Sequence, residues 1–232
     1  MTRPPSNVVD IWYHVGAGAS RRSQQRRRSL IQSTLSTYLA VAPDAVTIDV
    51  GPYGKPFVVG SDLEFSVAYD EQGTACAVTY GAAVGIDVEL PNAVGAVDQL
   101  LYVCTSRERR AIEAGFTAQE RTRIFLRLWT RKEAVLKACG VGFLETAPDL
   151  VETIDDVVDT GGRRFRVVDV DLPGACCAVA RQGLEEPSIR LFLRNHHQSG
   201  IFNGQTSWRS TREHGVPQGN GSSIAAKRPK AN

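Results

Sequence analysis

The order of apolar and polar positions divides the chain into strand-like and helix-like segments. Short runs rich in apolar, β-branched and aromatic residues, bounded by turn-forming residues, are typical of β-strands. The polar residues 70–73 and the pair Gly161-Gly162 are typical of hairpin turns between such strands. We expect strands at residues 8–15, 46–50, 63–69, 75–80, 84–90, 151–157, 164–170, 175–180 and 188–193.

Residues 21–39 have the spacing of an amphipathic helix. Ser20 is a suitable N-terminal cap. The apolar stripe of this helix consists of Leu30, Ile31, Leu35, Tyr38 and Leu39. Arginines crowd its first half, at positions 21, 22, 26, 27 and 28. These arginines form either a solvated helical face or a basic surface that attracts phosphate.

Two further helices are predicted from their capping signals. Thr105-x-x-Glu108 and Thr117-x-x-Glu120 both have the form of a capping box, which predicts helices over residues 106–114 and 118–139. Gly140 is a natural stop for the second one. The longer helix carries residues that we expect to anchor it in the core, namely Ile124, Phe125, Leu128, Trp129, Val135 and Leu136.

The composition is that of a soluble globular protein: 42% of the 232 residues are hydrophobic and 22% are charged. No apolar stretch approaches the roughly 18 residues of a membrane helix, and the N-terminus lacks the apolar core of a secretory signal. We therefore expect a cytoplasmic protein. A net charge of +2 argues against general nucleic-acid binding.

Cysteine and histidine usage gives no sign of a metal site. The five cysteines show no C-x-x-C spacing, so neither a zinc site nor a disulfide framework is expected. His196-His197 has no matching ligands nearby in the sequence. From residue 195 the composition shifts to Gly, Ser, Asn, Gln and basic residues, so we expect residues 195–232 to form a disordered tail.

Two short segments carry acids in positions that suggest chemistry. In the sequence VGIDVE, Asp87 and Glu89 lie two residues apart in a predicted strand and therefore share one face. Glu133 and Lys137 lie four apart in a predicted helix, again on one face. Taken separately, these are also the marks of a solvated edge strand and of a surface ion pair. Taken together, three carboxylates and a lysine suit a hard cation beside an anionic group, most simply a phosphate.

The order and spacing of these segments resemble the signature of the 4′-phosphopantetheinyl transferases. The signature is (V/I)-G-(I/V)-D-x-E, then about forty residues, then (W/F)-(S/T/C)-x-K-E-(A/S)-x-x-K, which here reads Trp129 to Lys137. The resemblance covers residues 8–181 and includes Gly54-Lys55-Pro56. The chain is most similar to the larger, two-lobed, surfactin-type class, which modifies carrier proteins of secondary metabolism. The resemblance implies an α+β fold of two similar lobes related by pseudo-twofold symmetry, each a small, mostly antiparallel sheet packed with helices. We place the lobes at residues 1–91 and 92–194.

The resemblance also implies a reaction and its partners. Enzymes of this family transfer the 4′-phosphopantetheine group of coenzyme A to a serine of an acyl or peptidyl carrier protein and release adenosine 3′,5′-bisphosphate. The expected partners are coenzyme A and an apo carrier protein that is acidic around its serine, with no nucleic acid and no membrane. The expected oligomeric state is a monomer.

The resemblance assigns roles to individual side chains. Asp87, Glu89 and Glu133 match the acids that bind Mg²⁺, with Mn²⁺ as the alternative, and Asp87, Glu133 and Lys137 form the expected catalytic set. Glu133 is a metal ligand, the general base, or both; the sequence leaves this open. Lys137 is expected at the pyrophosphate. The residues expected to contact coenzyme A are Lys55, Lys132, Lys137, Arg28 and Tyr69, although Lys132 has pairing with an acid as its other expected role.

The chain departs from the family at the segment that usually reads F-N-(L/I/V)-S-H-S. Here Tyr69 replaces the histidine and Asp70 follows it. A tyrosine hydroxyl donates a hydrogen bond but brings no positive charge. The arginine that the family often has near positions 31–33 is also missing, since Ile31-Gln32-Ser33 stands there, and Arg28 is its expected substitute. An alternative is therefore a catalytically weak relative that binds nucleotide or carrier protein; a metal-dependent phosphohydrolase fits the acids but not the paired motifs.

Overall fold

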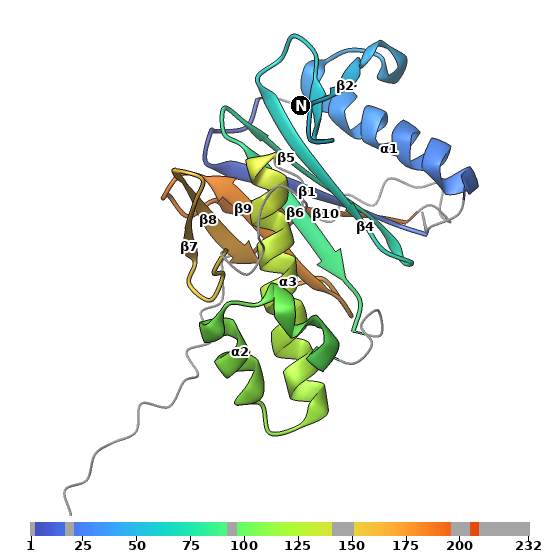
Figure 1. The fold of residues 1–232 in the computed structure, drawn as a ribbon. Helices are drawn as coiled ribbons and strands as arrows, with labels where there is room; N and C mark the ends of the chain where they lie inside the picture. Colours follow the sequence, from blue (N-terminus) through green and yellow to red (C-terminus); the bar gives the residue numbers. More distant parts are fainter. Residues whose placement is uncertain (1–2, 17–20, 92–96, 141–150, 196–204, 209–232) are drawn as a thin grey trace, which may run out of the picture.

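The computed structural model describes residues 3–16, 21–91, 97–140, 151–195 and 205–208 (Figure 1). One sheet has five strands in the order β11-β10-β1-β5-β4. In this sheet β10 runs parallel to β1, and the other neighbouring pairs are antiparallel. Its strands are β1 (Val8–Val15), β4 (Leu63–Tyr69), β5 (Gly73–Tyr80), β10 (Ser188–Asn195) and β11 (Gln205–Trp208).

A second sheet has four strands in the order β6-β9-β8-β7, all antiparallel. Its strands are β6 (Val84–Glu89), β7 (Val157–Thr160), β8 (Arg163–Asp169) and β9 (Cys176–Gln182). A small two-stranded sheet pairs β2 (Ile48–Val50) with β3 (Pro56–Val58). The hairpin at Gly161-Gly162 joins β7 to β8, as its sequence predicts.

The helices are α1 (Arg21–Leu39), α2 (Ser106–Glu113) and α3 (Ala118–Cys139), with short 3₁₀ segments η1 (Pro43–Ala45) and η2 (Val97–Val103). Both predicted capping boxes are present, at the start of α2 and of α3. Gly140 ends α3 in the left-handed conformation, with φ of 70°. Among the described residues, no helix has the length and apolar character needed to cross a membrane.

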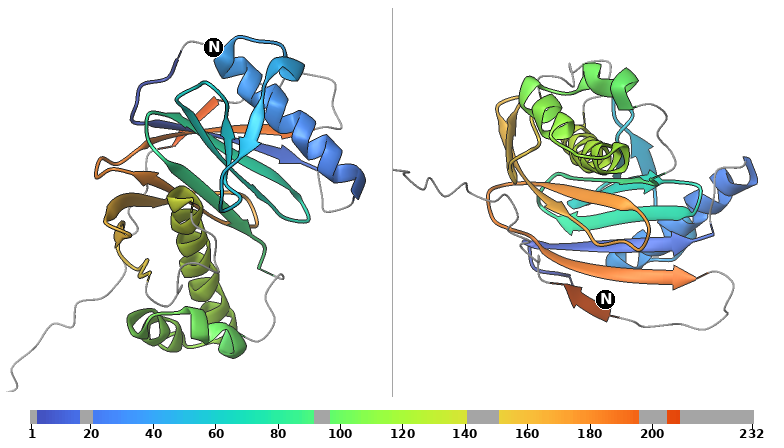
Figure 2. Two further views of the ribbon diagram at one scale, coloured as in Figure 1. Left: turned by 45° about the horizontal axis from the view of Figure 1, so that its top comes forward. Right: turned by 90° about the horizontal axis from the view of Figure 1, so that it is seen from below.

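Three apolar clusters stack these elements into layers, with α1 on the outer face of the first sheet and α3 on the outer face of the second (Figure 2). Between the sheets lie the inward residues of both, including Ile11, Ala77, Ile86 and Val179. Alternate residues of each strand therefore point to a helix instead. On β6, Val84, Ile86 and Val88 face the first sheet. The acids of β6 consequently face α3.

A mixed α/β fold is thus present, and the pseudo-twofold relation between its halves stays a prediction. Two strands depart from the expected division of the chain. The sequence predicts residues 188–194 in the second lobe, but β10 pairs with β1 in the first sheet. Four residues of the expected disordered tail form β11, which pairs with β10. The strand expected at residues 151–157 begins only at Val157.

A buried polar network ties β10 to β1. Asp10 is fully buried on β1, and the guanidinium of Arg190 on β10 donates to both of its carboxylate oxygens, at 2.5 and 2.7 Å. The Tyr38 hydroxyl of α1 donates to Asp10 at 2.7 Å and accepts from the indole N–H of Trp12, also at 2.7 Å. Because a buried carboxylate needs such partners, this network favours β10 as the neighbour of β1.

Gly85 allows α3 to approach β6 very closely. A Cβ atom at this position would lie 1.9 Å from the carbonyl oxygen of Ala134 and 2.5 Å from the amide nitrogen of Ala138. No side chain fits there without moving the helix. The glycine of the VGIDVE segment is therefore required by packing.

We predict that Gly85→Ala lowers the free energy of unfolding by about 1–3 kcal/mol or more, because the helix has to move away from the strand. Urea unfolding at pH 7 measures this loss. Gly51→Ala is the matched control, since the nearest atom to its added Cβ lies at 3.4 Å. Equal stability of the two variants would contradict the packing role of Gly85.

Candidate active site

One face of α3 lies opposite the acids of β6. Trp129, Glu133 and Lys137 follow one another at intervals of four residues and so occupy successive turns of the same helical face. The Lys137 ammonium donates to Asp87 Oδ1 at 2.7 Å. The Trp129 indole N–H donates to Glu89 Oε1 at 3.3 Å. The fold therefore brings the two predicted motifs together.

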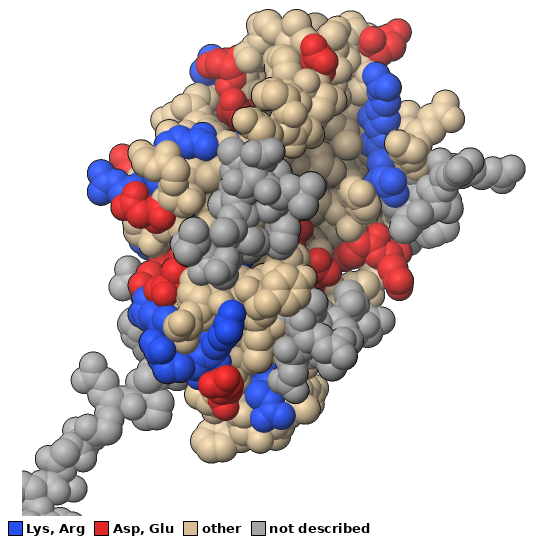
Figure 3. Space-filling model, in the orientation of Figure 1, with Lys and Arg blue, Asp and Glu red and all other residues tan. Residues whose placement is uncertain are grey.

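Burial and mutual repulsion destabilise the charged forms of these acids. Asp87 is 5% exposed, and burial raises its pKa, an effect that the Lys137 ammonium partly offsets. Burial also raises the pKa of Glu89 and of Glu133, and in both cases the negative charge of Asp87 raises it further. Figure 3 shows acidic side chains gathered where β4 and β6 end. A site of this kind favours a cation.

The donor set suits a hard divalent cation, although the side chains do not form a ready-made cage. Among the described residues, no three His, Cys, Asp or Glu side chains are close enough together to hold a metal ion. However, Asp87 Oδ2 is buried and has no hydrogen-bond partner. Glu89 and Glu133 lie close enough to feel the charge of Asp87, so the three carboxylates together could supply some of the oxygen ligands that Mg²⁺ prefers, with waters as the others.

A pocket of roughly 280 Å³ adjoins these residues. It lies between the loop before β3, the strand β4 and the helix α3. Its lining includes both acidic and basic groups, which suits a ligand with phosphates near a cation. The lining residues are Tyr53, Gly54, Lys55, Pro56, Ser66, Val67, Glu133, Leu136, Lys137 and Gly140.

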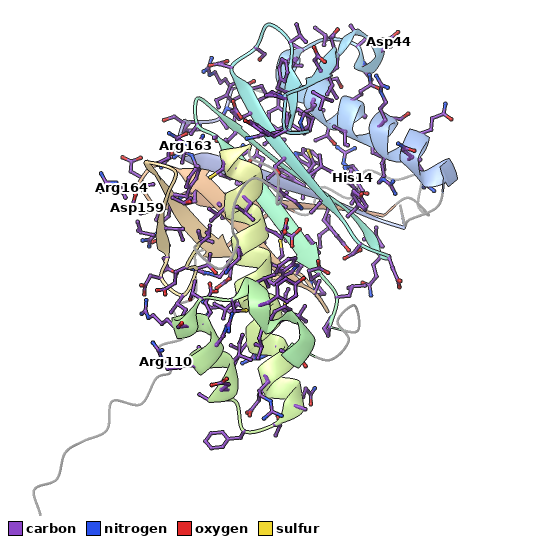
Figure 4. All side chains as sticks on the ribbon, viewed as in Figure 1. His14, Asp44, Arg110, Asp159, Arg163 and Arg164 are labelled. Atoms are coloured by element: carbon purple, nitrogen blue, oxygen red, sulfur yellow. The ribbon has the colours of Figure 1, made fainter. Side chains whose placement is uncertain are left out.

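Two cations from different parts of the chain meet at the C-terminal end of α3. Lys55 lies 3.5 Å from Glu64 and donates to the carbonyl of Ala138 at 3.2 Å. Arg163, labelled beside this end of the helix in Figure 4, donates to the carbonyl of Cys139 at 2.7 Å. Both cations complement the negative end of the helix dipole. Sequence reasoning missed Arg163, for which the only signal was its place directly after the Gly161-Gly162 turn.

Lys132 does not reach the pocket. Its side chain is buried, and its ammonium donates to the carbonyl of Val103 and to Glu108, both at 2.7 Å. The other oxygen of Glu108 accepts from the backbone and the hydroxyl of Thr153, each at 2.9 Å. The structure therefore does not support the expected contact between Lys132 and coenzyme A. Lys132 instead has its other expected role, pairing with an acid.

The two residues expected to replace missing family positions also lie outside the pocket lining. Tyr69 is 59% exposed at the end of β4, and the guanidinium of Arg27 lies 4.5 Å from its ring centre. Arg28 is exposed on α1. Asp70 accepts the backbone N–H groups of Gln72 and Gly73, each at 2.7 Å, so its carboxylate caps the hairpin turn. Contacts of Tyr69 and Arg28 with coenzyme A stay predictions.

The comparisons with known proteins all point to the same family. A family model described as the 4′-phosphopantetheinyl transferase superfamily matches residues 83–183. The chain is similar to 4′-phosphopantetheinyl transferase pptA of Paxillus involutus, with 31% identity over 205 residues, 72% of this chain and 76% of that protein.

Two bacterial relatives match over shorter stretches. 4′-phosphopantetheinyl transferase HetI of Nostoc sp. is 31% identical over 126 residues, 53% of each chain. The 4′-phosphopantetheinyl transferase of Bacillus subtilis is 27% identical over 114 residues, 49% of this chain and 50% of that protein. The chain thus spans about half the length of these two curated relatives.

We predict that Lys132→Met lowers the free energy of unfolding by about 3–5 kcal/mol, because it leaves the buried Glu108 carboxylate without its counter-charge. Urea unfolding at pH 7 checks this value. The double variant Lys132→Met/Glu108→Gln is the control and should recover most of the stability. An unchanged stability in the single variant would contradict a structural role for Lys132.

We also predict that Glu133→Gln stabilises the metal-free protein at pH 7–8. The pKa of Glu133 is raised above its ordinary 4.5 in the folded state, so folding holds a proton that the unfolded chain has released. The stability of the metal-free protein therefore falls as the pH rises from about 4.5 through the raised pKa. Glutamine stays neutral and avoids this loss.

Thermal unfolding between pH 4.5 and 8 measures the effect, which should vanish at the acidic end. Glu113→Gln, at an exposed carboxylate on α2, is the control and should show no such gain. A Glu133→Gln variant that is no more stable than wild type at pH 8 would contradict the repulsion described above.

Proposed function

This chain belongs to the 4′-phosphopantetheinyl transferase superfamily, and on that premise we propose that it transfers the 4′-phosphopantetheine group of coenzyme A to a serine of an acyl or peptidyl carrier protein. Adenosine 3′,5′-bisphosphate is the second product. The observation that carries the proposal is the meeting of Asp87 and Glu89 on β6 with Glu133 and Lys137 on α3. This arrangement lies beside a pocket that Lys55 and Lys137 also line.

Asp87, Glu89 and Glu133 would hold a divalent cation, for which we propose Mg²⁺, with Mn²⁺ as a substitute. The cation would neutralise charge on the pyrophosphate of coenzyme A when it is bound. In the reaction a bond forms between the serine oxygen and the phosphorus next to the pantetheine arm. The bond from that phosphorus to the bridging oxygen breaks, and adenosine 3′,5′-bisphosphate leaves.

Side chains of the protein would accept the serine proton and stabilise the negative charge on the departing oxygen. Glu133 lies where α3 meets Asp87 and Glu89, and we call this group of three acids the acidic face. Glu133 also lines the pocket, so it would accept the serine proton, hold the cation, or do both. Lys137 lies one helical turn away, where its ammonium pairs with Asp87, and it would stabilise the departing oxygen. Lys55 is partly engaged by Glu64, and a phosphate of coenzyme A would replace that carboxylate.

The further expectations belong to the same proposal. We infer a partner carrier protein that is acidic around its serine, a monomeric enzyme, a cytoplasmic location and a place in secondary-metabolite biosynthesis. The second candidate function, a weak relative that binds without efficient transfer, is favoured by two observations. Tyr69 lies exposed on the surface instead of lining the pocket, and Lys132 is buried.

The test is to incubate the protein with coenzyme A, Mg²⁺ and an apo carrier protein and to measure the mass of the carrier. We predict a mass gain of one phosphopantetheine group. Chelation of the divalent cation should prevent the gain, and its return should restore it. Tight binding of coenzyme A without any mass gain would favour the second candidate instead.

Glu133→Ala should lower the transfer rate by at least about 100-fold, since general-base catalysis alone contributes on that scale. Its circular dichroism should match wild type. Glu113→Ala, at an exposed position on α2, is the matched control and should transfer normally. A Glu133→Ala variant with an unaffected rate would remove Glu133 from the mechanism.

A further inference from the structure

Trp129 makes a polar contact that a core anchor does not need. It packs beside the apolar cluster that includes Phe125 and Leu128, which is the anchoring role expected from the sequence. Its indole N–H, however, points to the acidic face and donates to Glu89 Oε1 at 3.3 Å. We propose that Trp129 is a positioning residue that holds Glu89 in place for the divalent cation. The inference rests on the proposed function of this site.

Each of the two acids of β6 accepts a hydrogen bond through one oxygen from the same face of α3, Asp87 from a charged donor and Glu89 from a neutral one. Lys137 donates to one oxygen of Asp87, and Trp129 donates to one oxygen of Glu89. These donors lie one turn on either side of Glu133, which faces the pocket between them. The helix therefore sets the positions of both strand carboxylates relative to its own glutamate.

Each donor leaves the second oxygen of its carboxylate for another partner. For Asp87 this second oxygen is buried and has no hydrogen-bond partner. A carboxylate fixed through one oxygen presents the other in a defined direction, which is how outer-shell groups orient metal ligands. Trp129 would do this for Glu89.

The indole suits this role because it is a neutral donor. An indole N–H donates a hydrogen bond but carries no charge and accepts none. It therefore orients Glu89 without competing with a cation for the negative charge of the carboxylate. A lysine or arginine at the same position would neutralise Glu89 and weaken its attraction for a metal ion.

Packing fixes the position of the indole itself. The ring of Phe125, one turn earlier on α3, lies parallel to that of Trp129, with ring centres 6.2 Å apart and planes 13° apart. A phenylalanine at position 129 would keep an aromatic ring against Phe125 and remove the N–H donor to Glu89. That substitution therefore separates the packing role from the positioning role.

The experiment is a titration of the purified protein with Mn²⁺, with and without coenzyme A, in which the electron paramagnetic resonance signal of free Mn²⁺ reports binding. We expect Trp129→Phe to raise the dissociation constant for Mn²⁺ by roughly tenfold or more, the scale on which outer-shell partners change metal affinity. Its melting temperature should change little. In the transfer assay, a higher Mg²⁺ concentration should restore much of its rate.

Trp12→Phe is the matched control. Trp12 also donates its indole N–H to a buried partner, Tyr38, but it belongs to the network of β1, α1 and β10. This variant should lose stability and keep the Mn²⁺ affinity of wild type.

Three outcomes would overturn the inference: equal Mn²⁺ affinity in Trp129→Phe and wild type, an equal loss in both tryptophan variants, or no Mn²⁺ binding by wild type. A wild-type protein that binds Mn²⁺ in a Trp129-dependent way but transfers nothing to any carrier would support the inference and reject the proposed function.

Discussion

The close contact between the backbone of β6 and one face of α3 is the constraint on which the site depends. Gly85 permits it, because any side chain there would collide with the backbone of Ala134 and Ala138. Small residues on both sides keep the distance short, since Ala134 and Ala138 face Ala178 and Ala180 of the neighbouring strand β9. At this separation the donors of Trp129 and Lys137 reach the acids of β6 through single hydrogen bonds. A larger separation would leave room for water between the two motifs.

Charged groups on other sides of α3 fix its rotation. Arg131 is fully buried and donates to the carbonyl of Thr153 at 2.8 Å and to Asp169 at 3.1 Å, while Lys132 pairs with the buried Glu108. The Lys132–Glu108 pair is buried on both sides, and in the other pair only Arg131 is buried, but leaving any of these buried charges without its partner is costly. A rotation of α3 about its axis would break both pairs at once. We infer that these pairs keep residues 129, 133 and 137 turned toward β6. The buried residues Arg131 and Lys132 thus position the motif residues that face the acids.

The sequence predicts the local parts of this structure well, since capping boxes, strand alternation and the spacing of acids depend on neighbouring residues. It does not predict which of two adjacent charged residues in the motif is buried. Lys132 forms a buried ion pair with Glu108, whereas Glu133 lines the pocket. It also does not predict that β10 joins β1, because that pairing depends on a buried contact between residues 180 positions apart. Arg163 was missed for the same reason, since only folding brings it to the end of α3.

The charge balance of the acidic face explains why the site needs both its donors and its packing. Burial raises the pKa of Asp87, Glu89 and Glu133, the negative charge of Asp87 raises the pKa of the other two further, and Lys137 offsets only part of this effect. Left to themselves, such side chains would turn apart toward water. The strand and the helix prevent this, because a backbone held by apolar clusters on both faces of the second sheet cannot follow them. The repulsion is therefore retained in the folded protein, and a cation that enters the site relieves it. The attraction that we propose for a metal ion would thus arise from the packing as much as from the carboxylates.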